Sequence, residues 1–412
     1  MGAIRTAAEK LWSGETTTRA LHPMAMFLGL EEYRPGLAFV ASFANVTAIA
    51  TGEGLVLVDT GSAMAAAGIQ AAVRAWSAAP VHTAVFTHGH IDHVMGVDRF
   101  EAEARPAGAA PLRVVAHEAI RERFARYRLT AGYNAAINAR QFALPGLRWP
   151  TEYRLPDLVY RDRLTLEVGG ETLELHHDRG ETDDHTWLWL PRHRALVTGD
   201  LFIWASPNCG NPQKAQRYPA EWARALRAMA ELRAELLLPG HGPPIEGAAR
   251  VAEALGDTAA LLESLCRQTL ALLNQGAPLD TILAEVRAPD ALLARPYLRP
   301  VYDEPEFVVR NLVRQLAGWW DGNPARLKPP RDGALAAEVA ALTGGPGPLI
   351  DRARALAAAG DHALACQLAE WARAAAPADE AIRRARAEIY RDRAAREDSL
   401  MARNIFRAAA DD

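Results

Sequence analysis

The run Thr87-His-Gly-His-Ile-Asp-His93 constrains this chain more than any other stretch. Its H-x-H-x-D-H core gathers three imidazoles and one carboxylate over residues 88–93. An α-helix would spread these side chains around its circumference, because successive residues are rotated by about 100°. A tight loop at the end of a strand can direct them to one point, and the preceding segment, Val81 to Phe86, is typical of such a strand. We therefore expect a strand that ends in a loop with four converging polar side chains.

The side chains of this loop indicate a metal site. Imidazole nitrogens and carboxylate oxygens together suit zinc and related divalent transition-metal ions. The cluster has room for two ions, with His88 and His90 facing one and Asp92 and His93 facing the other. Two ions need more ligands than these four, so the remaining ligands must come from other parts of the chain.

Three further candidate ligands follow along the chain: His185, Asp200 and His241. Each stands where an apolar, strand-like run meets a glycine-containing turn, and such loops commonly carry functional residues. Upstream, the apolar run 54–58 ends in Asp59. A carboxylate at that position can hydrogen-bond a metal-binding histidine from behind.

Five segments now carry these residues: the strand that ends in Asp59, the 88–93 run, and the segments around His185, Asp200 and His241. In this order, they resemble the metallo-β-lactamase-fold hydrolase superfamily. The resemblance implies a binuclear centre with two Zn²⁺ ions, other divalent transition metals being alternatives. It implies these ligands, residue by residue: His88, His90 and His185 for the first metal, Asp92, His93 and His241 for the second, and Asp200 as the bridge. Asp59 matches the aspartate that supports the ligands.

The pattern of elements changes near residue 250. Before it, short β-rich runs alternate with helical runs, which fits two sheets packed face to face with helices outside. After it, helical periodicity takes over, and small residues at helical spacing in 349–412 are typical of tetratricopeptide-like pairs. We therefore predict an α/β chain, with an αββα catalytic domain over 1–255 and an all-α domain over 256–412.

Motifs in the second half narrow the resemblance to the alkylsulfatases of this fold. These motifs are Pro305 to Asn311, Gly318 to Pro324 and Ala359 to Asp361. They resemble the alkylsulfatase dimerisation domain, which implies a homodimer formed through the C-terminal helical domain. The alkylsulfatases hydrolyse linear and secondary alkyl sulfates, so the resemblance implies a small-molecule ester substrate of that kind.

Two segments of the first half extend the resemblance to substrate contacts. Residues 118–141 resemble the alkylsulfatase helix beside the active site, which implies that Asn134 and Asn138 contact substrate. After the bridging carboxylate, Asn208, Asn211 and Arg217 occupy the region of the family's sulfate-binding Asn and Arg. The spacing there does not match cleanly, and a solvated polar loop is the alternative.

The chain also departs from the alkylsulfatases in two respects. Their sterol-carrier-like domain follows the dimerisation module, whereas this sequence ends at Asp412, so we expect that domain to be absent. They use carboxylates where this chain has His185, whose Gly-x-Thr-x-x-His setting belongs to the wider superfamily. The scaffold is thus alkylsulfatase-like, while the ligand set is that of binuclear hydrolases in general.

These ligands imply hydrolysis by a metal-bound hydroxide. Asp200 would bridge the metals, and Asp92 would orient the hydroxide and take its proton. Alkyl sulfates are the favoured substrates, with a phosphodiester, lactone or thioester as the alternative. A non-catalytic metal-binding module is the alternative from another class, which the complete ligand set disfavours.

Composition and sequence pattern argue against a nucleic-acid-binding protein, a cysteine metal site and a membrane-spanning protein. The formal net charge of −4 over 412 residues gives no general attraction to nucleic acid. The three cysteines fit no C-x-x-C metal pattern and suit free thiols in a reducing compartment. No apolar run approaches the roughly 20 residues that span a bilayer. We therefore expect a cytoplasmic enzyme with no targeting segment and no membrane span.

Overall fold

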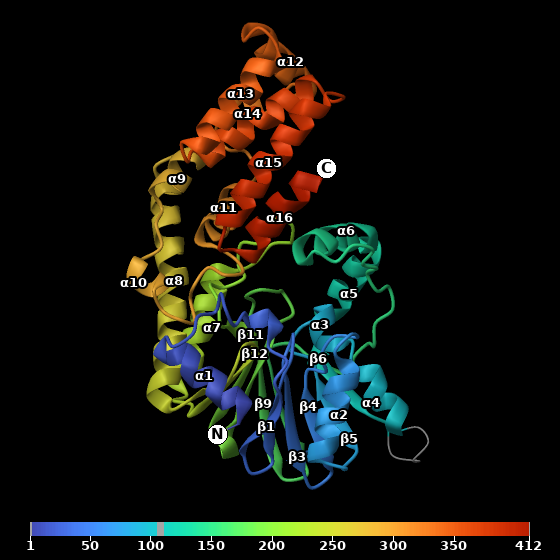
Figure 1. Ribbon diagram of the computed structural model, residues 1–412. Helices are drawn as coiled ribbons and strands as arrows, with labels where there is room; N and C mark the ends of the chain where they lie inside the picture. Colours follow the sequence, from blue (N-terminus) through green and yellow to red (C-terminus); the bar gives the residue numbers. More distant parts are fainter. Residues whose placement is uncertain (1, 105–110, 412) are drawn as a thin grey trace. The chain divides into compact units, whose positions relative to one another are not determined.

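The computed structural model describes residues 2–104 and 111–411 and divides into two compact units (Figure 1). The first unit consists of Met1–Ala131 and Trp149–Gly318, and the second of Gly132–Arg148 and Trp319–Asp412. Helix α8 (Ala248–Asn274) runs through residue 255 and belongs to the first unit. The domain boundary expected at 255/256 stays a prediction.

Two sheets form the centre of the first unit (Figure 1). The first sheet has the order β1 to β7, antiparallel from β1 to β4 and parallel from β4 to β7. Its strands are β1 (Gly29–Arg34), β2 (Leu37–Ala41), β3 (Val46–Thr51), β4 (Gly54–Val58), β5 (Val81–Val85), β6 (Arg113–His117) and β7 (Leu158–Tyr160).

The second sheet has the order β13-β12-β11-β10-β9-β8. Its strands are β8 (Arg163–Val168), β9 (Glu171–His177), β10 (Thr186–Leu190), β11 (Ala195–Ile203), β12 (Leu236–His241) and β13 (Ile245–Glu246). Neighbouring strands are antiparallel except for β11 and β12, which run parallel. The carboxyl ends of β11 and β12 therefore lie at the same edge of the sheet.

Strand β4 shows how the layers are built. Its side chains alternate between two apolar cores, because successive residues of a strand point to opposite faces. Val56 belongs to a core that includes Leu188 of the second sheet, and Leu57 belongs to one that includes Ile69 of helix α2 (Ala66–Trp76). The sheets thus pack face to face with helices outside, which confirms the predicted αββα sandwich.

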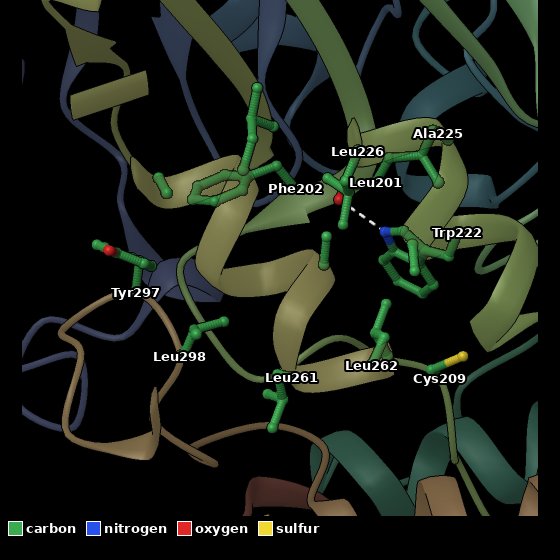
Figure 2. Close-up of a cluster of buried hydrophobic side chains, with 14 of the residues drawn as sticks. Leu201, Phe202, Cys209, Trp222, Ala225, Leu226, Leu261, Leu262, Tyr297 and Leu298 are labelled. Carbon is green, nitrogen blue, oxygen red and sulfur yellow. Dashed lines mark hydrogen bonds between the residues drawn. The ribbon is translucent and has the colours of Figure 1, made fainter. Parts of the chain in front are cut away.

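The outer face of the second sheet is covered by helices α7 (Pro219–Glu231) and α8. Figure 2 shows part of this core, where Trp222 Nε1 donates a hydrogen bond of 2.8 Å to the Leu201 carbonyl oxygen. Leu262 of α8 and Tyr297 belong to the same core. The other helices of this unit are α1 (Ala3–Ser13), α3 (Ile91–Val94), α4 (Val97–Ala104), α5 (Ile120–Leu129), α9 (Leu279–Glu285), α10 (Asp290–Leu293) and α11 (Pro305–Ala317).

Helices build the second unit, as the small-residue pattern predicts. They are α6 (Ala131–Phe142), α12 (Asp332–Leu342), α13 (Pro346–Ala358), α14 (His362–Ala375), α15 (Glu380–Arg396) and α16 (Leu400–Asp411). Buried alanines such as Ala353, Ala365 and Ala369 let these helices pack closely. Across residues 2–104 and 111–411, no helix is long and apolar enough to cross a bilayer.

Candidate metal centre

The H-x-H-x-D-H run leaves strand β5 and starts the short helix α3. His90 is the extended residue before α3, so Asp92 and His93 fall in the first helical turn. Asp59, at the end of β4, holds this loop: its carboxylate accepts hydrogen bonds from Thr87 N (2.8 Å) and Thr87 Oγ1 (2.7 Å). His93 Nδ1 lies 2.7 Å from Asp59 Oδ2, so Nε2 of that ring points the other way.

Four side chains form a first donor group: His88, His90, Glu181 and Asp200. One nitrogen or oxygen from each lies within 4.8 Å of all the others. His88 Nε2 and His90 Nδ1 are 2.8 Å apart, and His90 Nδ1 lies 3.7 Å from Glu181 Oε1. His88 Nε2 is 3.8 Å from Asp200 Oδ2. All four side chains are buried except that of His90, which is partly exposed.

Asp92, His93 and His241 form a second donor group with the same 4.8 Å spread. Asp92 Oδ2 lies 3.7 Å from His93 Nε2 and 3.6 Å from His241 Nε2. Asp200 of the first group also approaches the second, because its Oδ1 is 3.4 Å from His93 Nε2 and its Oδ2 is 3.4 Å from His241 Nε2. Gly240 makes this approach possible, since a Cβ there would lie 2.1 Å from Asp200 Oδ1.

Unsatisfied buried atoms test whether these residues fit metal ions. His93 Nε2, Asp200 Oδ1 and Glu181 Oε2 have no hydrogen-bond partner within the described part of the chain. Buried polar atoms are normally paired, because leaving them unpaired costs free energy. Three such atoms at the two donor groups, all nitrogen or oxygen, fit divalent ions of the zinc type.

The ionisation of His88 and His90 suits metal ligands. Burial and the neighbouring His93 hold the pKa of His88 well below its usual range, and burial together with Arg123 and Arg217 does the same for His90. These rings are therefore neutral near pH 7, which is the form that binds metal. Burial would lower the pKa of His93, but nearby carboxylates, Asp200 foremost, outweigh it and raise that pKa.

Glu181 is a member of the first group that sequence reasoning did not select. His185, which it did select, lies outside both donor groups: its Nε2 is 3.0 Å from the Thr198 carbonyl oxygen. The His185 ring stacks on that of His88, with centroids 4.8 Å apart. Glu181 follows Gly180 in the same segment as His185, where the alkylsulfatase resemblance implies carboxylates.

Asn208, Asn211 and Arg217 lie buried in the loop after β11, and Asn208 and Arg217 contact Glu181 of the first group. Arg217 NH1 donates hydrogen bonds to Glu181 Oε1 (2.5 Å) and to the Asn208 carbonyl oxygen (2.5 Å), and Asn208 Nδ2 donates to Glu181 Oε1. Asn211 Oδ1 accepts from Gln213 N at 3.1 Å. The loop is thus packed and internally bonded rather than solvated.

Lys214 adds an amine to this region, and Tyr302 adds a hydroxyl group. Burial, reinforced by Arg217, lowers the pKa of Lys214 to about 7. Tyr302, which precedes α11, is buried, and burial raises its pKa well above the usual value, with Glu181 adding to the shift. No motif in the sequence pointed to Tyr302.

Asn134 and Asn138 lie on α6, in the second unit. Asn138 Nδ2 donates a hydrogen bond of 2.8 Å to the Asn134 carbonyl oxygen, one helical turn away. Their expected contact with substrate stays a prediction.

Comparison with known proteins agrees with this geometry. The metallo-beta-lactamase superfamily model matches residues 40–241, and the alkyl sulfatase dimerisation model matches residues 279–412. A linear primary-alkylsulfatase of Pseudomonas sp. is 27% identical over 354 residues, which cover 80% of this chain and 65% of the relative. An (R)-specific secondary-alkylsulfatase of Pseudomonas sp. is 27% identical over 411 residues, covering 93% of this chain and 62% of the relative.

A solved structure extends the likeness to the fold. The stereoselective inverting sec-alkylsulfatase from Pseudomonas sp. superimposes with a TM-score of 0.83 at 25% identity, over 93% of this chain and 65% of that one. The chain thus spans less than two thirds of the length of these relatives. The two matched segments and the superposition lead to one conclusion. The chain combines a metallo-β-lactamase superfamily domain over residues 40–241 with an alkylsulfatase dimerisation domain over residues 279–412.

Proposed function

We propose that this chain is a binuclear, zinc-dependent hydrolase of alkyl sulfate esters. The observation that carries the proposal is the place of Asp200 between two donor groups, 3.4 Å from both His93 Nε2 and His241 Nε2. A carboxylate shared in this way suits a bridging ligand, and the relatives that resemble most of the chain are named alkylsulfatases.

The donor set is assigned from the geometry. In this proposal one ion is held by His88, His90 and Glu181, the other by Asp92, His93 and His241, and Asp200 contributes to both. In this proposal Glu181 takes the place of His185 in the set that the sequence implied, because His185 lies outside both donor groups and its Nε2 contacts the Thr198 carbonyl oxygen. Two bound zinc ions supply Lewis acidity, which acidifies water and stabilises negative charge on an ester oxygen.

The chain's own groups orient the reaction. Asp59 fixes the His93 ring through Nδ1, so that Nε2 faces the second donor group. Asp92 is partly exposed, unlike buried Asp200, so its carboxylate can meet incoming water and accept a proton at Oδ2. Asp92 and Asp200 are therefore the catalytic carboxylates of the proposal.

Positive charge around the first donor group favours an anionic substrate. Arg123, Arg217 and Lys214 all lower the pKa of His90, so each contributes positive potential at that ring. A cleft with such a potential attracts anions and raises their local concentration. A sulfate ester carries one negative charge close to the bond that is cleaved, and it matches this potential better than a neutral lactone or thioester.

A substrate panel tests the proposal. Purified chain, either zinc-loaded or stripped with a chelator, is offered an alkyl sulfate, a bis-aryl phosphodiester, an acyl lactone and a thioester. Sulfate release by the zinc-loaded protein alone supports the proposed activity. Faster turnover of another ester, without sulfate release, shows that the chain is a hydrolase of a different substrate class. Absence of turnover with all four, despite bound zinc, supports the non-catalytic metal-binding module instead.

We also propose a homodimer formed through the helical C-terminal region. The dimerisation model matches residues 279–412, and large apolar side chains are exposed within that range. Trp319 and Leu342 are 73% and 88% exposed. Large exposed apolar side chains are costly on a free surface and suit an interface.

A further inference from the structure

The backbone between His88 and His90 is pressed against helix α5. A Cβ placed on Gly89 would lie 2.8 Å from Arg123 Cδ and 3.0 Å from both Ile120 Cγ1 and Phe124 Cε1. A side chain at this position would force Arg123 to shift and would crowd Ile120 and Phe124. The absence of a Cβ therefore lets the ligand-bearing loop lie close against α5.

Asp184 holds the same backbone from the other side. Its Oδ2 accepts a hydrogen bond of 2.8 Å from Gly89 N, and its Oδ1 accepts one of 2.7 Å from Arg123 Nε. The Asp184 side chain is fully buried and that of Arg123 is 6% exposed. A buried charge pair with both partners hydrogen-bonded resists distortion, because separating the partners leaves a charge uncompensated.

Asp184 connects the two loops that carry His88, His90 and Glu181. Glu181 precedes Asp184 by three residues, while Gly89 separates His88 from His90. Thr186 N also donates to the Thr87 carbonyl oxygen at 2.6 Å, so the two loops are tied at a second point next to the Asp184 contact. The distance between the two histidines and Glu181 thus depends on the Asp184 carboxylate.

We propose that Asp184, oriented by Arg123, is a positioning residue that sets the spacing of the first donor group and so its affinity for zinc. This inference rests on the proposed function, because it takes His88, His90 and Glu181 to be zinc ligands. Asp184 does not bind the metal itself. It acts through Gly89, and support of this indirect kind commonly changes metal affinity by about 10–100-fold.

Asp183 provides a matched control. Its carboxylate also pairs with Arg123, and with Arg126 at 3.5 Å, so it belongs to the same charge cluster. Within the residues that the structure describes, no hydrogen bond joins its side chain to the 88–93 loop. Asp183→Asn therefore removes a charge from Arg123 without removing the support of Gly89.

The experiment measures zinc binding by Asp184→Asn and Asp183→Asn in the full chain. Metal is removed with a chelator, and zinc is titrated back against a chromophoric competitor, with the melting temperature of each metal-free protein recorded in parallel. We expect Asp184→Asn to retain one tightly bound zinc and to bind the second about 10–100-fold more weakly. Asp183→Asn should bind both ions as the wild type does, even if its metal-free melting temperature falls similarly.

Three results overturn the inference. The first is that Asp184→Asn binds two zinc ions with wild-type affinity and keeps its melting temperature. The second is an equal loss of zinc affinity in both variants. The third is that Asp184→Asn has a lower metal-free melting temperature but unchanged zinc affinity. If Asp184→Asn does not fold, Arg123→Lys replaces it, because lysine keeps the charge but not the geometry of the Nε contact. Weaker binding of one ion by Arg123→Lys supports the inference, and unchanged binding overturns it.

The failure of the inference is distinct from that of the proposed function. A wild-type chain that binds no zinc refutes the binuclear centre and this inference together. A wild-type chain that binds two ions, with an Asp184→Asn variant that does the same, refutes only the role of Asp184.

Discussion

The Arg217 guanidinium donates a 2.5 Å hydrogen bond to Glu181 Oε1, and both side chains are buried. This pair connects the loop after β11 to the first donor group. Arg217 therefore pairs with a carboxylate of the centre, and its expected contact with substrate stays a prediction. The Arg217 Nε atom is buried and has no hydrogen-bond partner among the described residues.

Removing this guanidinium should damage both the fold and the centre. In the metal-free chain, Arg217→Ala leaves Glu181 as an uncompensated buried charge, which costs about 3–5 kcal/mol of unfolding free energy in comparable cases. Denaturant unfolding measures that loss. Arg227→Ala is the control, since its ion pair with Glu263 is exposed and should contribute only about 0–1 kcal/mol. Equal stability of Arg217→Ala and wild type would show that the buried pair does not form.

Asp200 should be required for a two-metal centre. In Asp200→Ala, His93 and His241 lose the carboxylate that lies 3.4 Å from each of them, and the two donor groups lose their shared member. We expect bound zinc to fall from two ions to at most one per chain and turnover to vanish. Elemental analysis checks the metal content, with Asp98→Asn as an exposed control on α4. An active Asp200→Ala protein with two ions would contradict the bridge.

Glu181 and His185 should behave differently on substitution. Glu181→Gln removes a charged donor from the first group, so one zinc ion should bind more weakly. His185→Gln should keep both ions, because its Nε2 contacts the Thr198 carbonyl and not a donor group, although stability should fall with that contact. Zinc titration distinguishes the two. Loss of one ion in His185→Gln alone would restore the ligand set that the sequence implied.

The same pair of residues shows where sequence reasoning reaches its limit. The H-x-H-x-D-H run and its strand follow from local pattern, because loop geometry and ligand chemistry are fixed within a few residues. Which of Glu181 and His185 faces the centre depends on Thr198, on a different strand, whose carbonyl engages the histidine. No spacing within residues 180–186 encodes that contact.

The elements of the fold were also predictable from local pattern, whereas the contacts between distant segments were not. Alternation and apolar runs predict the two sheets, and the small-residue spacing predicts the helical C-terminal part. The first compact unit nevertheless extends to Gly318, because Leu262, Tyr297 and Val308 complete the core around Trp222. These contacts join segments far apart in the chain, so a change of periodicity near residue 250 does not reveal them.

Assembly should depend on exposed aromatic residues of the C-terminal part. We expect light scattering to give a dimer, and Trp319→Asp to shift it toward monomer, because tryptophans often dominate interface energetics. Leu129→Asp is the control: Leu129 is 87% exposed but lies outside the dimerisation match. A stable wild-type monomer at micromolar concentration would contradict the proposed dimer, and an effect of Leu129→Asp would move the interface to the first unit.

Asp303 should make stability depend on pH. Its carboxylate is buried and accepts hydrogen bonds from Gly210 N (2.6 Å) and Glu304 N (2.8 Å), which ties the Arg217 loop to the start of α11. Burial raises its pKa to about 6 from an ordinary value of 3.8, although these amides and Arg217 oppose the shift. Since the folded chain holds this proton more tightly, the associated stability is complete below about pH 4 and is lost as pH rises through about 6.

The expected loss is on the order of 3 kcal/mol across this window, because each unit of pKa difference corresponds to about 1.4 kcal/mol. Asp303→Asn cannot ionise, and its amide oxygen can still accept one of the two hydrogen bonds. Its unfolding free energy, relative to wild type, should therefore rise between pH 4 and pH 7. Urea unfolding at several pH values measures the difference, with Asp280→Asn on an exposed position of α9 as the control. A difference between wild type and Asp303→Asn that stays constant over this range would mean that Asp303 is already ionised in the folded chain below pH 4.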